Sequence, residues 1–251
     1  MGLVKLSAEQ TTVRIHSVNT GALVEALVET PGGQVSYDGD TTICGIPGTS
    51  APVQLGFEKI VGSQTNKLFP TGSKTNTLLN TRASCLDVVV PMVITRASDF
   101  GIDGNEDQYM LNNNQNLLER IESIRLAAAQ LMGLGDRSQS VIPKFGLRVK
   151  PKHGGSASVR YFTPWKCHPA LAVTSSLCIS ACLLIPDTIA HGLVQLETRT
   201  PTTVNLEHLL GSIDVRLDYE ILENNFHLHR AAVLRTTRLL FSGLVAVPGT
   251  V

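Results

Sequence analysis

Charged and aromatic side chains are both scarce in this sequence: they make up 17% and 5% of its 251 residues, and the formal net charge is zero. A protein that binds nucleic acid usually presents a basic face, so this balance argues against a nucleic-acid partner. No secretory signal is visible at the N-terminus. We therefore expect a cytoplasmic globular protein that buries a core of its own.

Cysteine and histidine are too few and too scattered for a metal centre. The five cysteines are an odd number without the paired spacing of a zinc site, so we interpret them as reduced thiols of an intracellular protein. Of the seven histidines only His227 and His229 are close in sequence, and no third ligand accompanies them. The sequence predicts no metal site.

Charge is also missing from one whole segment, between Pro169 and Pro186. From Ser175 to Ile185 the apolar residues leave no polar stripe at any helical angle, which is typical of a helix buried on every side. A membrane span is the alternative, but the run is shorter than the roughly 20 apolar residues that a bilayer requires. We predict no membrane span and a central helix, ended by Pro186, inside a shell of strands.

The first turn of this central helix has two interpretations. Thr174, Ser175 and Ser176 carry hydroxyls of the kind that cap free N–H groups at a helix start. The same N–H groups, with the partial positive charge of the helix end, can instead bind a carboxylate or a phosphate. The residues alone leave both interpretations open.

Most of the remaining chain has the pattern of short strands broken by glycine and proline. Residues 11–30 indicate a hairpin that turns at Asn19-Thr20-Gly21, and a polar segment over 62–81 indicates a hinge. We predict one unit over residues 1–81 and a second over 82–251, with a C-terminal tail that either stays with the second or returns to the first. Further strands are predicted at 34–57, 85–97, 144–151, 156–164, 189–200, 202–210 and 212–220.

One amphipathic helix is predicted over residues 116–132, between the strands of the second unit. Asn116 and Glu119 approximate a capping box at its start, and Gly133 ends it. Arg125 lies at the edge of the apolar face, where we expect a guanidinium that reaches the solvent.

Several further side chains have reactive chemistry but an ordinary explanation. Cys178 can act as an acid or base only if it reaches a cleft, and core packing is favoured one turn into an apolar helix. Cys167 and His168 are adjacent in an extended segment, so their side chains point to opposite faces and do not pair. His168 remains a candidate for binding anions. Lys144 and Arg160 are also candidates, with a solvated surface as their default.

The C-terminal tail is locally basic. Arg230, Arg235 and Arg238 would suit an anionic ligand, although a solvated face is the simpler explanation.

Six segments occur in the order found in a known family. They are GDTTICGIPGTSAPVQLGF at 39–57, LFPTG at 68–72, LERIESIRLAAAQLMGL at 118–134, IPKFGLRVKP at 142–151, the central helix, and RTTRLLFSGLVAVP at 235–248. Together they resemble the PrpF family of 2-methylaconitate cis-trans isomerases, methylitaconate and aconitate Δ-isomerases and oxalomesaconate tautomerases. The resemblance covers nearly the whole chain.

The resemblance implies an α+β, diaminopimelate-epimerase-like fold, in which two strand barrels each surround a central helix and the active site lies between them. It also implies an isomerase of small unsaturated di- or tricarboxylates. Such an enzyme moves a proton along an allylic system without cofactor or metal. The reaction needs positioned acid and base groups, and hydrogen-bond donors for the carboxylates and the developing enolate.

The sequence departs from the family at two places. Family members carry a longer N-terminal part with a catalytic lysine and a Cys-Gly-Asn motif, which neither Lys5 nor Cys44 matches. Val90 stands where an asparagine is expected to face the ligand. We therefore expect an N-terminally truncated chain with an incomplete first lobe and a largely complete second lobe. A homodimer or a partner chain would complete the first lobe.

The matching site residues lie in the second lobe alone. Thr174, Ser175 and Ser176, with His168, are the expected substrate-binding residues, and Cys178 is the one minor candidate for catalysis. The alternative function is a non-catalytic remnant or an interaction protein, which would expose apolar surface where the first lobe is incomplete. A racemase or epimerase is disfavoured, because nothing matches the glycine-rich, cysteine-containing loop of those enzymes.

Overall fold

The protein has an α+β fold in this computed structural model, which describes residues 4–7, 9–18, 21–192, 200–223 and 225–244. The predicted α+β class is confirmed. Its strands are β1 Gln10–His16, β2 Leu23–Glu29, β3 Ala51–Glu58, β4 Asn76–Leu78, β5 Thr81–Val88, β6 Val90–Arg96, β7 Lys144–Val149, β8 Ala157–Phe162, β9 Cys167–His168, β10 Thr202–His208, β11 Gly211–Leu222 and β12 Asn225–Thr237. Its helices are α1 Gln108–Asn112, α2 Gln115–Leu131 and α3 Val173–Leu184, with short 3-10 turns at Pro31–Gly33 and Ala97–Phe100.

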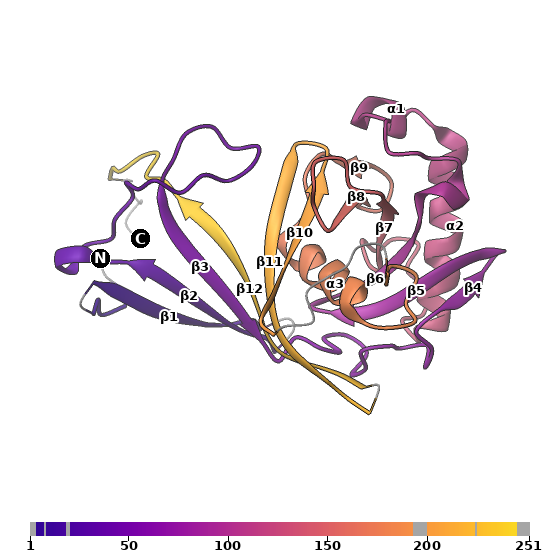
Figure 1. The fold of residues 1–251 in the computed structure, drawn as a ribbon, viewed down its shortest axis with the longest axis horizontal. Helices are drawn as coiled ribbons and strands as arrows, with labels where there is room; N and C mark the ends of the chain where they lie inside the picture. The colour runs from indigo at the N-terminus through magenta and orange to yellow at the C-terminus, as the bar shows by residue number, and fades with distance from the viewer. Residues whose placement is uncertain (1–3, 8, 19–20, 193–199, 224, 245–251) are drawn as a thin grey trace, which may run out of the picture.

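One continuous sheet runs through the whole molecule (Figure 1). Its strand order is β1-β2-β3-β12-β11-β10-β8-β7-β6-β5-β4, and β9 pairs with β8 at the side. Figure 1 shows two lobes: β1, β2 and β3 fan out at the left, and the helices gather with the other strands at the right. Strand β12 pairs with both β3 and β11, so the C-terminal strand joins the two lobes.

The predicted central helix is confirmed as α3. Every residue from Ser175 to Leu184 is buried, and α3 packs against β5, β6, β10 and β11. The absence of a polar stripe follows from this position, because strands surround the helix on several sides.

Strands β5 and β6 bury apolar side chains on both faces because each face is covered by a helix. Met92 and Ile94 of β6 belong to the same buried cluster as Ile179 of α3. Val93, between them, faces the other way and packs in the cluster that contains Ile121 of α2. In Figure 1, α2 accordingly lies on the opposite side of these strands from α3.

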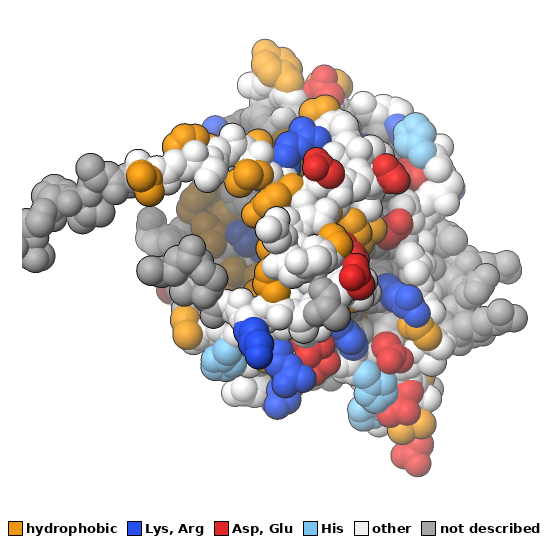
Figure 2. All heavy atoms as spheres, turned by 90° about the vertical axis from the view of Figure 1, so that its left-hand side faces the viewer, with side chains coloured by type: hydrophobic (Ala, Val, Ile, Leu, Met, Phe, Trp, Pro, Cys, Tyr) orange, Lys and Arg blue, Asp and Glu red, His pale blue; other side chains and the backbone are white. Residues whose placement is uncertain are grey.

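The first lobe is more open than the second. The predicted hairpin is confirmed by the pairing of β1 with β2, while Asn19 and Thr20 of its turn lie outside the described residues. Along β2 only Ala26 is buried, and its other residues are half-buried. Figure 2 shows hydrophobic side chains bordering a hollow on this side of the molecule. The second lobe is thus filled by α3, whereas the first-lobe sheet has incomplete cover.

Two predictions about local structure are wrong. The run 85–97 is not one strand but part of a hairpin, which turns at Val89 with a φ of 63°. A run of three valines carries no turn residue, so nothing in the sequence marks this reversal. Helix α2 is capped by Asn114, whose side chain accepts a hydrogen bond from Leu117 N at 3.1 Å, and not by a box built on Asn116.

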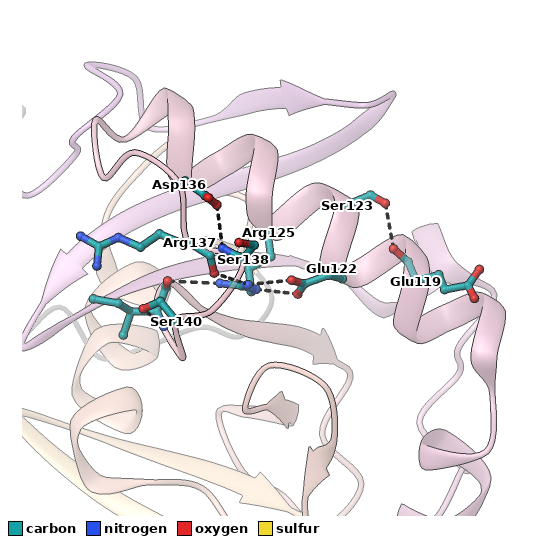
Figure 3. A network of polar contacts seen from close by, with 9 residues as sticks. Glu119, Glu122, Ser123, Arg125, Asp136, Arg137, Ser138 and Ser140 are labelled. Atoms are coloured by element: carbon teal, nitrogen blue, oxygen red, sulfur yellow. Dashed lines mark hydrogen bonds and ion pairs between the residues drawn. The ribbon is translucent and has the colours of Figure 1, made fainter.

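The prediction of a solvent-exposed Arg125 is also wrong. Its side chain is fully buried, and the guanidinium points toward Glu122 and backbone carbonyl groups of the segment that follows α2 (Figure 3). A predicted strand at 189–200 is absent over residues 189–192, and residues 193–199 lie outside the described part. Residues 34–50 form no strand beyond one isolated bridge, between Thr41 and Ser50.

Candidate functional site between the lobes

A cavity of about 320 Å³ lies between the two lobes, at the first turn of α3. The first lobe contributes small and apolar groups, and the second contributes the β5–β6 turn and the start of α3. Its walls are formed by Ser17, Ala22, Val24, Phe57, Gln64, Val89, Val90, Pro91, Ile142 and Thr174. An apolar cavity with a few polar groups is the usual form of a small-molecule site.

The helix start that opens into this cavity has no side-chain cap. The N-cap residue is Ala172, and no side chain in the described part of the protein caps the first turn. The capping interpretation of Thr174, Ser175 and Ser176 is therefore wrong. Ser176 instead donates its hydroxyl to the carbonyl of Val173 at 2.7 Å, within its own helix. The first-turn N–H groups are left for water or a ligand.

Thr174 and Ser175 occupy different depths. Thr174 is half-buried and lines the cavity, whereas Ser175 is fully buried behind it. The Ser175 hydroxyl makes no hydrogen bond of regular geometry among the described residues. It lies beside the phenol of Tyr161, whose pKa is raised by burial and held back by this hydroxyl.

Gln64 reaches the cavity because a buried carboxylate holds its loop. Asp87 is fully buried at the end of β5, and its Oδ2 accepts hydrogen bonds from the backbone N–H groups of Gln64 and Thr65 at 2.8 and 2.9 Å. Its Oδ1 accepts from the hydroxyl of Ser63 at 2.7 Å. The segment predicted as a hinge is therefore fixed to the second lobe at this point.

Sequence reasoning missed Gln64, Ser17 and Asp87. A charged residue inside the apolar run LDVVV is a signal for Asp87, because a buried carboxylate needs several donors. No comparable signal marks Gln64 or Ser17, since their place at the cavity depends on how distant segments pack.

The described lining contains no acidic, basic or thiol side chain. Cys178 is fully buried in the core around α3, and burial raises the pKa of its thiol well above the usual value. Val90, at the position where an asparagine was expected, contributes an apolar wall. The cavity as described can hold and orient a ligand, but its lining offers no proton-transfer group.

The remaining candidates lie elsewhere. His168 is exposed on β9 and does not line the interlobe cavity; its ring stands edge-on to Tyr161, 6.2 Å between centroids. Cys167 is buried while its neighbour is exposed, so their side chains do point apart. Arg160 is buried and donates to the carbonyl of Gly104 at 2.7 Å, which contradicts its default as a surface residue. Lys144 is half-buried, and burial lowers its pKa.

The part of the chain that the structure describes contains neither a cluster of metal ligands nor a helix able to span a membrane. No three His, Cys, Asp or Glu side chains gather closely enough there to hold a metal ion. None of the described helices has the length and apolar character needed to span a bilayer.

A solved structure defines the class of protein. The crystal structure of a methylitaconate-delta-isomerase matches with a TM-score of 0.80 and 26% sequence identity, over 98% of this chain and 71% of that one. The fold is therefore diaminopimelate-epimerase-like, as predicted.

The family follows from the sequence comparisons. The profile described as PrpF protein matches residues 1–248, and the chain belongs to the PrpF family. "Putative isomerase YbhH" of Escherichia coli K12 is 42% identical over 247 residues, which are 98% of this chain and 69% of that protein. The "(4E)-oxalomesaconate Delta-isomerase" of Novosphingobium sp. KA1 is 36% identical, over 98% of this chain and 68% of that protein. By this resemblance the protein is an enzyme, an isomerase. The matches do not establish the predicted N-terminal truncation.

Proposed function

We propose that the protein is a cofactor-independent isomerase of small unsaturated di- or tricarboxylates, of the aconitate, methylaconitate or methylitaconate type. The observation that carries this proposal is the uncapped first turn of α3, which opens into an apolar interlobe cavity. The relatives named for oxalomesaconate and methylitaconate support the substrate class.

In the proposed binding mode, one substrate carboxylate lies at the start of α3. The backbone N–H groups of Val173, Thr174 and Ser175 and the hydroxyl of Thr174 donate hydrogen bonds to it, and the helix dipole favours its charge. Ser176 takes no part, because its hydroxyl is bonded within the helix. His168 does not line this cavity, so we assign it no contact with this carboxylate.

The proposed reaction removes an allylic proton and returns it at the other end of the three-carbon system. The carboxylate conjugated to the double bond accepts the negative charge of the intermediate, and donors at the α3 start stabilise it. The group that moves the proton does not come from the described lining of the cavity, and we assign that role to no residue.

The test of this proposal is a pair of substitutions at Thr174. Thr174→Val keeps the shape but removes the hydroxyl donor, so affinity for methylitaconate or itaconate should fall about tenfold, the effect of one hydrogen bond to a charged group. Thr174→Ser should bind as the wild type does. Titration calorimetry measures both, and equal affinity for all three proteins would refute carboxylate binding by this side chain.

A second candidate is a non-catalytic protein that binds or interacts. Two observations favour it: the described cavity lining has no proton-transfer group, and the first-lobe sheet is only half covered. A homodimer or partner chain seated on that sheet would belong to this alternative. It predicts di-acid binding without turnover and strong binding of a hydrophobic dye, whereas the isomerase predicts turnover.

A further inference from the structure

A second cavity, of about 110 Å³, lies where residues 43–46 meet the β10–β11 turn and the end of β12. It shares no lining residue with the interlobe cavity. The polar side chains in its wall are Cys44, His208, Ser212 and Arg235. The four come from three distant parts of the sequence, so only the fold brings them together.

The cavity has positive character. Arg235 is half-buried, and among the described residues its guanidinium forms no ion pair with a carboxylate. No acidic side chain of the described residues lines the cavity. The charged neighbours that act on His208 are Arg235, Arg160 and His168, all of them basic. Arg235 would attract a small anion that enters, because no carboxylate of the described lining opposes it.

His208 forms a fixed, neutral part of this wall. Its Nδ1 accepts a hydrogen bond from the N–H of Leu210 at 3.2 Å. Burial lowers the pKa of this imidazole; the Arg235, Arg160 and His168 charges lower it further, against a hydrogen bond to the backbone of Pro169 that raises it. At neutral pH the positive charge in the lining is therefore that of Arg235.

Cys44 is the exposed thiol of the five. Its Sγ lies 3.6 Å from the hydroxyl of Ser212. The β10–β11 turn lies so close to Cys44 that a Cβ added at Gly211 would be 2.5 Å from the Cβ of Cys44. Thiolates and not thiols are nucleophiles, and accessibility decides which cysteine reacts.

The other four cysteines cannot compete with Cys44 for a reagent in solution. All are buried, and burial raises the pKa of the Cys167 thiol to about 11 and of the Cys85 thiol to about 12. They remain protonated and shielded near neutral pH. These four buried thiols therefore serve as internal controls for selective reaction at Cys44.

We propose that this second cavity is a modification site, where Arg235 binds a carboxylate of a small α,β-unsaturated di-acid and Cys44 adds to its double bond. The Cys44 thiol first releases its proton to solvent. Its sulfur then forms a C–S bond at the β-carbon, the C=C π bond breaks, and the electron pair moves onto the α-carbon as an enolate. That carbon takes a proton from water, so nothing leaves and no oxidant is needed.

An adduct would lie beside the start of α3. Ala170 and Leu171 line the second cavity and lead directly into the helix whose first turn opens into the interlobe cavity. The choice of an unsaturated di-acid rests on the proposed function, but charge-guided attack by Cys44 does not.

The experiment measures alkylation of the native protein by iodoacetate and by neutral iodoacetamide, followed by intact mass and peptide mapping. Both reagents form a C–S bond and release iodide, so only their charge differs. We expect one modified site, Cys44, and a ratio of iodoacetate to iodoacetamide rates about fivefold higher than in Arg235→Gln, as for one charge pair a few ångströms apart in water. Salt should lower the ratio.

Two control variants accompany Arg235→Gln. Arg82→Gln removes an exposed charge on β5 and should leave the ratio unchanged, while Cys44→Ser should abolish labelling. Incubation of the native protein with itaconate should add the mass of one itaconate at Cys44. Labelling of another cysteine first, or a ratio unaffected by Arg235→Gln, would overturn the charged site. The expected iodoacetate-to-iodoacetamide ratio without an itaconate adduct would overturn the di-acid chemistry alone. Neither the rate ratio nor the adduct depends on isomerase activity.

Discussion

The guanidinium of Arg125 is fully buried, and four hydrogen bonds satisfy it. Its Nε and Nη2 each donate to a carboxylate oxygen of Glu122 at 2.7 Å. Nη2 also donates to the carbonyl of Arg137 at 2.9 Å, and Nη1 to that of Ile142 at 3.1 Å. A buried ion pair offsets its desolvation only when such additional bonds are present. Arg125 therefore ties α2 to the segment that leads into β7.

Removing the Arg125 side chain should destabilise the folded protein. Arg125→Met should lower the free energy of unfolding by about 3 kcal/mol, because two carbonyls and a carboxylate lose their donor. Urea unfolding measures the change. Glu119→Met, at an exposed position of the same helix, is the matched control and should cost less than about 1 kcal/mol. Similar losses for both variants would contradict a structural role for the buried pair.

Glu207 at the end of β10 holds the loop before β8. Its carboxylate accepts hydrogen bonds from the backbone N–H groups of Lys152, His153 and Gly155 at 2.8, 2.7 and 2.9 Å. Burial alone would raise its pKa, but these donors and the charge of His153 outweigh burial and lower the pKa below its usual value. A carboxyl whose pKa is lowered by folding stabilises the folded state above the unfolded pKa.

The stability supplied by Glu207 should therefore be complete at neutral pH and be lost as the pH falls through its lowered pKa. Glu207→Gln should cost about 2 kcal/mol at pH 7, and its stability should decline less steeply in acid. Unfolding by urea at a series of pH values tests this. Glu9→Gln, at an exposed position, should follow the wild-type curve. Parallel curves for Glu207→Gln and wild type would contradict the linkage.

At the scale of elements, the start of α3 matters most, because no described side chain caps its N–H groups. Ala172 has the extended backbone of a normal N-cap residue, with φ −66° and ψ 141°. Ala172→Asp should therefore place a carboxylate on the first-turn N–H groups, stabilising the fold by about 1 kcal/mol. The new carboxylate would compete with the ligand, so di-acid affinity should fall at least tenfold while thermal stability rises. Unchanged affinity in a stabilised variant would show that ligands do not use this helix end.

The sequence predicts elements well where one physical requirement dominates. Helix α3 is predictable because a run apolar on every side has to be buried, and the β1–β2 hairpin because its strands alternate around a glycine turn. The Val89 turn is not predictable, since no turn residue marks its φ of 63°. Its N–H donates to the carbonyl of Ile60 at 2.6 Å, a partner far away in the sequence. Arg125 is not predictable either, because the two carbonyl groups that accept its hydrogen bonds lie 12 and 17 residues along the chain.

At the scale of the whole molecule, β12 is the connection that creates the interlobe cavity. It pairs with β3 in one lobe and β11 in the other. Residues 22, 24 and 57 therefore face residues 89–91 and 174 across one space. Periodicity cannot predict such a site, because its walls depend on which strand returns to which lobe. The resemblance to a family pointed to the α3 side and to position 90, but not to Ser17 or Gln64. The boundary between residues 81 and 82 and the truncated N-terminus stay predictions.

The most direct test of isomerase function is proton nuclear magnetic resonance of methylitaconate incubated with the native protein in D₂O. Allylic proton transfer should move the double bond and introduce solvent deuterium at the carbon that receives the new proton, and Thr174→Val should slow both changes. A ligand that binds yet keeps its double bond and all its protons would contradict the isomerase and leave the non-catalytic binding protein.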